Sequence, residues 1–184
     1  INKYLIKLNI YFFVLYMTKK YCFVNCLKEI LQMNYYRNHE AVSGSVHNIS
    51  KHEDAIMDLF MKYEFKELKQ EQKISKKQIK SWIENPQLSY INVGEFICQP
   101  FGKNNNPDFI IRVDHNCIVP VEAKSCKEPN PLYNSGGISK NYLYIFSCEK
   151  YNQTTIYWGK DIITEEQQLI LDELKSSQKK LEKD

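Results

Sequence analysis

The clearest alternation of hydrophobic and polar positions lies in the middle of the chain. Two apolar runs, Phe109–Val113 and Ile118–Lys124, flank the polar tripeptide Asp114–Asn116. Because Asn116 can adopt the left-handed conformation that a three-residue hairpin loop needs, the pattern predicts a β-hairpin with its strands over these two runs.

The register of this hairpin follows from its turn. If Val113 and Cys117 close the loop, the numbers of facing residues sum to 230, and Asp108 lies opposite Glu122. Side chains alternate along a strand, so Lys124 shares the face of Glu122, while the apolar residues between them point into a core. The sequence therefore predicts two carboxylates and one amine on a single face of the hairpin.

Carboxylates opposed on neighbouring strands repel each other, so a cation is needed to offset them. Oxygen ligands with room left for water suit magnesium or manganese better than zinc. A metal site at Asp108 and Glu122 is thus one interpretation. The other is a surface hairpin on which Glu122 and Lys124 are solvated residues that contribute little as a salt bridge.

Three segments have the form of a helix-capping box, a Ser or Thr followed three residues later by Glu or Gln: Ser50–Glu53, Ser75–Gln78 and Thr164–Gln167. Apolar residues follow each segment at helical spacing. The first predicts a helix of about four turns, and the second a short helix that Pro86 ends. The third predicts an amphipathic closing helix, which could cover the core or form a dimer face.

Further strands are predicted at Leu88–Cys98, with Gly94 as a bulge or close-approach point, and at Tyr142–Ser147 and Thr154–Trp158. Together with the hairpin they predict an α/β fold. Its central mixed sheet would have about five strands, with the Glu53 helix on one side and the C-terminal helix on the other.

Residues 1–36 are dense in Tyr, Phe, Leu and Lys. The uncharged run Leu8–Thr18 is too short to span a bilayer, and no small-residue cleavage site follows it. The stretch could be an apolar helix packed on the domain, a membrane-surface anchor, or non-native sequence upstream of a start at Met33. We favour the last interpretation, because every recognisable feature follows Met33, and expect one domain over residues 37–184.

Composition changes this picture little. The formal net charge of the 184 residues is +3, but lysines are concentrated in Lys66–Lys80 and Lys175–Lys183, which could line a DNA-binding cleft or simply face solvent. The six cysteines are scattered without zinc-ligand spacing, which favours a reduced, intracellular protein of the cytoplasm. The sequence has no glycine-rich phosphate loop and no Ser or Cys nucleophile motif.

The spacing Pro107-Asp108, thirteen residues, then Glu122-Ala123-Lys124 resembles the active-site signature of the PD-(D/E)XK nuclease superfamily. The flanking stretches Phe96–Gly102 and Tyr133–Ser147 resemble type II restriction endonucleases of that superfamily, and the resemblance covers roughly residues 45–163. It departs from the family pattern at Tyr133, where tryptophan is expected, and before Lys140, where proline is expected. The resemblance therefore bears more on catalysis than on sequence recognition.

The resemblance implies a restriction-endonuclease-like three-layer core and the metal-assisted, site-specific hydrolysis of double-stranded DNA. Asp108 and Glu122, with the Ala123 carbonyl, would hold one or two Mg²⁺ ions, for which Mn²⁺ could substitute. Lys124 would act on the attacking water and the phosphate, and Glu53 would approach the metal unless it serves only as a helix cap. The expected partners are DNA, a second copy of the chain in a homodimer, and a cognate DNA methyltransferase, with no membrane.

Two loops are expected to contact DNA. The turn-rich segment Gln99–Asn106 enters the site just before Asp108, and its Gln99 and Lys103 are candidates. The segment Lys127–Asn141 has no helix or strand pattern, and loops of that length are usually functional or disordered. Its polar residues are of the kinds that read base edges or grip phosphate oxygens: Asn134, Ser135, Ser139, Lys140 and Asn141.

Two other functions stay open. One is a structure-specific or repair nuclease of the same superfamily. The other is a DNA-binding module whose nuclease site has decayed, against which the presence of Asp108, Glu122 and Lys124 argues.

Overall fold

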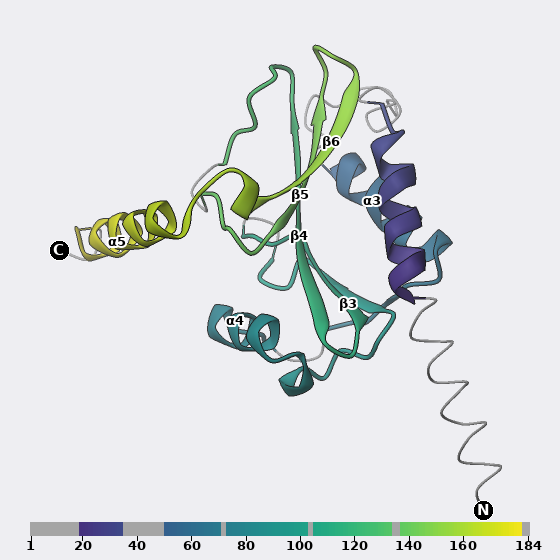
Figure 1. Ribbon diagram of the computed structural model, residues 1–184, viewed down its shortest axis with the longest axis horizontal. Coiled ribbons are helices and arrows are strands. Elements are labelled where there is room, and N and C mark those ends of the chain that lie inside the picture. Colours follow the sequence, from purple (N-terminus) through teal and green to yellow (C-terminus); the bar gives the residue numbers. More distant parts are fainter. Residues whose placement is uncertain (1–18, 35–49, 71–72, 103–104, 134–136, 182–184) are drawn as a thin grey trace, which may run out of the picture.

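A mixed six-stranded sheet with helices on both faces forms the centre of the protein (Figure 1). The computed structural model describes residues 19–34, 50–70, 73–102, 105–133 and 137–181. The strands lie side by side in chain order: β1 Lys66–Glu67, β2 Glu95–Cys98, β3 Phe109–Asp114, β4 Cys117–Cys126, β5 Leu143–Cys148 and β6 Gln153–Trp158. The predicted α/β class and mixed sheet are confirmed, with a sixth, two-residue strand at one edge.

The central hairpin has the predicted register along most of its length. Phe109 faces Val121 and Arg112 faces Ile118, so the facing numbers sum to 230 as expected. The turn itself differs, because Asp114 pairs with Cys117 across a shift in register. The predicted three-residue loop and left-handed Asn116 are therefore wrong. The Asp114 carboxylate instead accepts the Asn116 N–H at 2.6 Å, which holds a tighter turn.

One face of the sheet is covered by α3, Ser50–Lys62, and by a helix over residues 19–31. Phe60 of α3 lies at the centre of this layer, with its ring 5.6 Å from that of Phe96 and 5.4 Å from that of Phe109. Buried Phe23, Cys26 and Ile30 belong to the same core. Of the three interpretations of the N-terminal stretch, the apolar helix packed on the domain describes its residues 19–34, and the boundary at residue 36 stays a prediction.

The opposite face is covered by α4, Lys76–Glu84. Its predicted capping box is confirmed: Ser75 Oγ accepts the Gln78 N–H at 3.2 Å, and Gln78 Oε1 accepts the Ser75 N–H at 2.9 Å. The buried Ile79 and Trp82 pack against residues of β2 and β3 such as Ile110. Because Phe109 and Ile110 are neighbours on a strand, they point into different layers, and α3 and α4 sandwich the sheet.

The C-terminal helix α5, Glu165–Leu181, does not cover the sheet as predicted. It extends away from the body (Figure 1), and Ile170 and Leu174 are 51% and 60% exposed. The layer assigned to it is filled by α4, whose Ile79 and Trp82 are buried against that face. The cap predicted for α5 is confirmed, since Gln167 and Thr164 bond each other's backbone N–H.

The strand predicted over residues 88–98 is correct only in its last four residues, Glu95–Cys98. Pro86–Leu88 forms a short 3-10 helix, for which the fixed φ of proline is suited, and Gly94 turns the chain with φ +86° before β2 begins. The N–H of Gly94 donates to Arg112 and its carbonyl accepts from Lys66, so the glycine anchors β1 and β3 at the same point. None of the helices in the described ranges is long and apolar enough to cross a membrane.

Candidate active site

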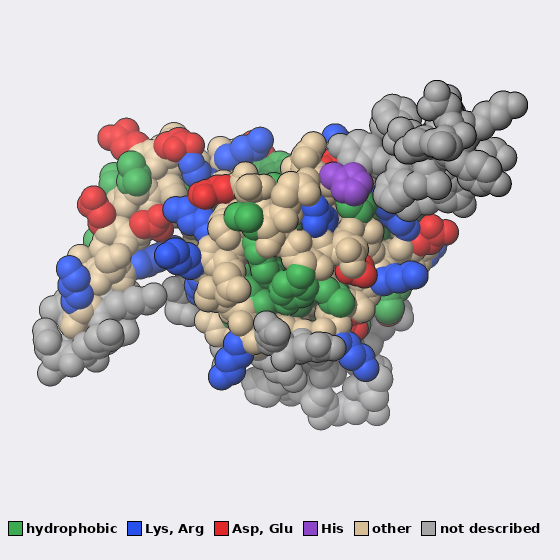
Figure 2. All heavy atoms as spheres, turned by 90° about the horizontal axis from the view of Figure 1, so that it is seen from below, with side chains coloured by type: hydrophobic (Ala, Val, Ile, Leu, Met, Phe, Trp, Pro, Cys, Tyr) green, Lys and Arg blue, Asp and Glu red, His purple; other side chains and the backbone are tan. Residues whose placement is uncertain are grey.

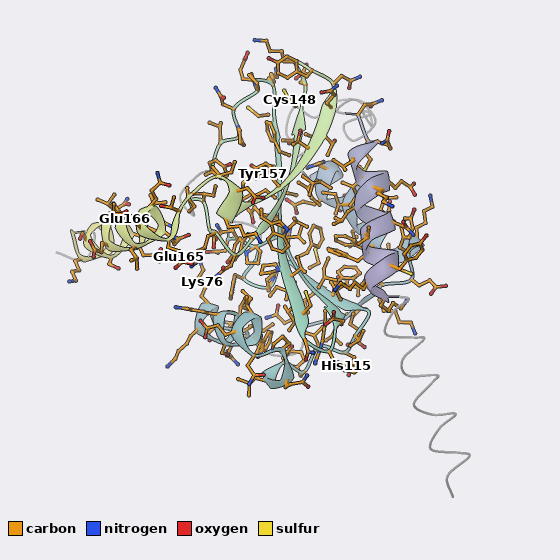
Figure 3. The ribbon with its side chains drawn as sticks, viewed as in Figure 1. Lys76, His115, Cys148, Tyr157, Glu165 and Glu166 are labelled. Carbon is orange, nitrogen blue, oxygen red and sulfur yellow. The ribbon has the colours of Figure 1, made fainter. Side chains whose placement is uncertain are left out.

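A cleft of about 1420 Å³ opens between α4 and α5, with β4 as its floor. Asp108, Glu122 and Lys124 lie on the floor. Figure 3 labels Lys76 on α4 and Glu165 on α5, which line opposite walls of the cleft. Figure 2 shows Lys side chains gathered where the α5 arm meets the body.

The two carboxylates on the floor are brought together by the hairpin register. Asp108 directly precedes β3, and its Oδ2 accepts the backbone N–H of Ala123 at 2.7 Å. Glu122 belongs to β4 and faces the cleft, whereas Val121 and Ala123 on either side of it lie in the core beneath α3. Asp108 is 7% exposed and Glu122 only 3% exposed. The alternative of a surface hairpin with solvated Glu122 and Lys124 is therefore wrong for Glu122, and the Lys124 side chain is only 20% exposed.

Both carboxyl groups are costly to ionise in this position. Burial raises the pKa of Asp108, and the nearby charges of Glu122 and Glu53 raise it further. Burial also raises the pKa of Glu122, against which the Lys124 ammonium and the backbone N–H of Asp108 act. Three acidic groups thus share one electrostatic environment. The register predicted the meeting of Asp108 and Glu122, whereas the sequence left the role of Glu53 open.

Lys124 lies two residues along the strand from Glu122, and its Nζ is 2.5 Å from Glu122 Oε1. The second oxygen, Oε2 of Glu122, is buried and has no hydrogen-bond partner among the described residues. A buried carboxylate oxygen normally accepts at least one hydrogen bond, because leaving it unpaired costs free energy. The site therefore has one buried carboxyl oxygen that the protein leaves without a hydrogen bond.

Glu53 reaches the site from α3. Its Oε2 accepts a hydrogen bond from Gln99 Nε2 at 2.8 Å, and its charge contributes to the raised pKa of Asp108. Gln99 has φ +46°, an unusual conformation for a residue other than glycine, and its own N–H donates to the Asp108 carbonyl at 2.6 Å. This turn directs the Gln99 side chain toward Glu53. The predicted capping role of Ser50 toward Glu53 lies outside what is described.

The structure describes only some of the residues expected to contact DNA. Ser139 and Lys140 line the cleft, but both already have protein partners: the Ser139 N–H donates to the Tyr144 hydroxyl at 2.8 Å, and the Lys140 ammonium pairs with Glu165. Gln99 is bonded to Glu53, as stated above. Lys103 and Asn134 lie outside the described residues.

Several cleft residues were not singled out from the sequence. His52 is 2% exposed and lines the cleft beside Glu53; it lies four residues before the buried Ile56, which is a signal that it faces inward. Tyr142 also lines the cleft, and burial, together with the charge of Glu122, raises its pKa to about 12. Lys175 of α5 reaches the cleft because that helix forms a wall.

The donor set on the floor suits a hard cation. No group of three or more His, Cys, Asp or Glu in the described ranges is arranged to hold an ion unaided, and all six cysteines are free thiols. Two carboxylates and a backbone carbonyl leave positions for water and substrate oxygens, which is how magnesium is commonly bound. Comparisons of the chain with protein-family models, curated proteins and solved structures found no match.

Proposed function

We propose that this protein is a divalent-metal-dependent endonuclease that hydrolyses phosphodiester bonds of double-stranded DNA. The observation that carries the proposal is the meeting of Asp108, Glu122 and Lys124 on the floor of one cleft. Two carboxylates can hold a divalent ion, and an amine beside them can stabilise charge on a phosphate, which suits metal-assisted phosphodiester hydrolysis. The same residues carry the resemblance to the PD-(D/E)XK nucleases.

A divalent cation fits the floor of the cleft. The unpaired Oε2 of Glu122 and the raised pKa values of the two carboxyl groups favour a positive charge beside them, and Lys124 is the cation that the described residues place on the floor. Asp108, Glu122 and the Ala123 carbonyl would hold the ion, Mg²⁺ or in its place Mn²⁺, with Glu53 close by. When bound, such an ion polarises a phosphoryl oxygen and lowers the pKa of a coordinated water.

Lys124 acts on the reacting phosphate in this proposal. Its side chain is only 20% exposed and is fixed by the ion pair with Glu122, so little reorganisation is needed when charge develops. A preorganised cation stabilises the negative charge that grows on the phosphate in the transition state. It also lies where it can orient the attacking water.

The walls of the cleft supply sequence-independent affinity for a polyanion. Lys76 and Lys80 of α4 line one wall and Lys175 of α5 lines the other. Each contact with a DNA phosphate releases a counterion, so three such lysines make binding dependent on salt. Recognition of a specific site, a restriction-endonuclease-like core and a cognate methyltransferase rest on the resemblance alone.

Digestion of a fully sequenced plasmid tests the proposal. We expect discrete fragments in Mg²⁺ or Mn²⁺, none in EDTA, and no cleavage by Asp108→Ala or Lys124→Ala proteins that bind DNA normally and melt cooperatively. Retained magnesium-dependent cutting by either variant would defeat the site assignment. Cutting restricted to branched or damaged DNA would indicate a structure-specific nuclease, and no cutting of any DNA would indicate a decayed binding module.

A further inference from the structure

Three tyrosines pack together beside the floor of the cleft. The ring of Tyr144, on β5, stacks on that of Tyr157, on β6, with the centroids 5.3 Å apart and 10° between the planes. The ring of Tyr133 meets Tyr144 edge-on at 5.5 Å, and the hydroxyls of Tyr133 and Tyr157 share a hydrogen bond of 2.8 Å. Figure 3 labels Tyr157 of this group. Tyr144 is fully buried, so its ring is fixed by its neighbours.

The side chain of Tyr144 links the floor of the cleft to a segment of its rim. The register of β4 and β5 pairs Glu122 with Tyr144, whereas the pair before it, Val121 and Leu143, lies in the core beneath α3. Because side chains alternate along a strand, Glu122 and Tyr144 both point toward the cleft side of the sheet. At its far end the Tyr144 hydroxyl accepts the Ser139 N–H at 2.8 Å. One rigid side chain therefore connects the strand neighbour of Glu122 to the backbone of Ser139.

The backbone around Ser139 is also held by the chain that follows β6. The N–H of Gly159 donates to the Tyr142 carbonyl at 2.9 Å, and the N–H of Lys160 donates to the Lys140 carbonyl at 3.0 Å. The Ser139 carbonyl lies so close to Gly159 that a Cβ added there would be 1.9 Å from its oxygen, so a side chain at this position would displace the segment. Ser139 and Lys140 thus have a fixed backbone, although neither belongs to a helix or a strand.

We propose that Tyr144 is a positioning residue for DNA: by holding the backbone of Ser139 it sets where Lys140 meets a phosphate of the duplex. Lys140 lines the cleft, and its ammonium pairs with Glu165, whose side chain is 85% exposed. Exposed ion pairs contribute little free energy, so a DNA phosphate can replace the glutamate. Since Tyr144 stands beside Glu122, its length also sets how far this phosphate lies from the proposed metal. The inference rests on the proposed function, and Tyr144 itself touches no substrate.

Tyr144→Phe in the full chain removes the hydroxyl and keeps the ring. We expect the Kd for a fluorescein-labelled duplex of mixed sequence, measured by anisotropy in EDTA at low salt, to rise about fivefold. The rate of plasmid cleavage at saturating DNA in Mg²⁺ should stay within about twofold, because the substitution removes binding and leaves the residues of the floor in place. Tyr63→Phe is the matched control: its hydroxyl donates to Glu29 at 2.9 Å beneath the other face of the sheet, and its loss should leave the Kd unchanged.

Amide exchange of Ser139, followed by NMR without DNA, tests the contact itself. Exchange should be faster in Tyr144→Phe than in the wild type and unchanged in Tyr63→Phe. Tyr157→Phe, which keeps the stacked ring and frees Tyr133, should weaken DNA binding in the same direction and serves the test if Tyr144→Phe does not melt cooperatively.

The inference and the proposed function fail in different ways. A Tyr144→Phe protein that binds the duplex as tightly as the wild type overturns the inference alone, as does a Ser139 amide whose exchange does not respond to the substitution. A wild-type chain that binds no DNA defeats the proposed function, and the inference with it.

Discussion

Replacing Asp108 with asparagine is expected to stabilise the protein in the absence of metal. Burial, together with Glu122 and Glu53, raises the pKa of Asp108 from 3.8 to about 8. Asparagine removes the charge but keeps an oxygen that can accept the Ala123 N–H, which lies 2.7 Å from Asp108 Oδ2. The substitution therefore removes the electrostatic cost and retains the hydrogen bond.

The magnitude follows from the proton that Asp108 retains on folding. The pKa of an unfolded aspartate lies about three units below pH 7. At about 1.4 kcal/mol per unit, keeping Asp108 protonated in the folded state lowers the unfolding free energy by on the order of 4 kcal/mol. Because the asparagine amide is itself a polar group that burial penalises, we expect asparagine to recover about half of this. For a chain of this size, about 2 kcal/mol corresponds to a rise in Tm of about 4–8 °C.

The pH dependence of the unfolding free energy tests the direction of this effect. A carboxyl whose pKa is raised in the folded state binds more protons folded than unfolded between about pH 4 and pH 8, so the unfolding free energy of the wild type falls as pH rises through that range. In EDTA, the advantage of Asp108→Asn in thermal unfolding should therefore be larger at pH 8 than at pH 5. Asp58→Asn, at an exposed position of α3, should show no such dependence.

Added Mg²⁺ should reverse this ranking. Under the proposed function the wild type binds the ion and is stabilised by it, whereas the asparagine variant has lost a ligand. An Asp108→Asn protein that is no more stable than wild type at pH 8 in EDTA would refute the electrostatic argument. Equal stabilisation of both proteins by Mg²⁺ would refute the metal assignment.

Four further substitutions separate the roles of other residues. Gln99→Ala, which frees Glu53, should raise several-fold the Mg²⁺ concentration for half-maximal cleavage without changing DNA affinity; an unchanged metal titration would contradict a positioning role. Lys80→Glu should weaken DNA binding and lower its dependence on salt, measured by fluorescence anisotropy, whereas a constant slope would place Lys80 away from the phosphates. Ser75→Ala removes the cap of α4 and should cost about 1 kcal/mol in urea unfolding. Phe60→Ala empties the centre of the core and should cost about 3–5 kcal/mol, so a loss under 1 kcal/mol would mean that the layer repacks.

The hairpin and its pair of carboxylates could be predicted because strand periodicity and register are local properties. Once the alternation around Asp108 and Glu122 is read, only the turn has to be placed, and an error of one residue there left the register of the strands intact. The cap of α4 was predictable for the same reason, since Ser75 and Gln78 satisfy each other's backbone within one turn.

The position of α5 and the support of Glu53 could not be predicted in this way. Both α4 and α5 have an amphipathic pattern, and nothing local decides which of them covers the second face of the sheet. The bond between Gln99 and Glu53 joins residues 46 positions apart and depends on the positive φ of Gln99, a backbone conformation that glutamine rarely adopts. Such contacts are set by tertiary structure, which patterns of three or four residues do not encode.

The helix over residues 19–31 bears on how the protein should be produced. Lys62 at the end of α3 and Tyr63 just after it donate to Glu29 of this helix, and its Phe23 ring lies 6.5 Å from that of Phe60. A recombinant chain shortened to begin at Met33 would lose these contacts and expose the hydrophobic side of α3 to solvent. Aggregation of such a truncated protein would then result from the loss of part of its hydrophobic core and would carry no information about its catalytic activity.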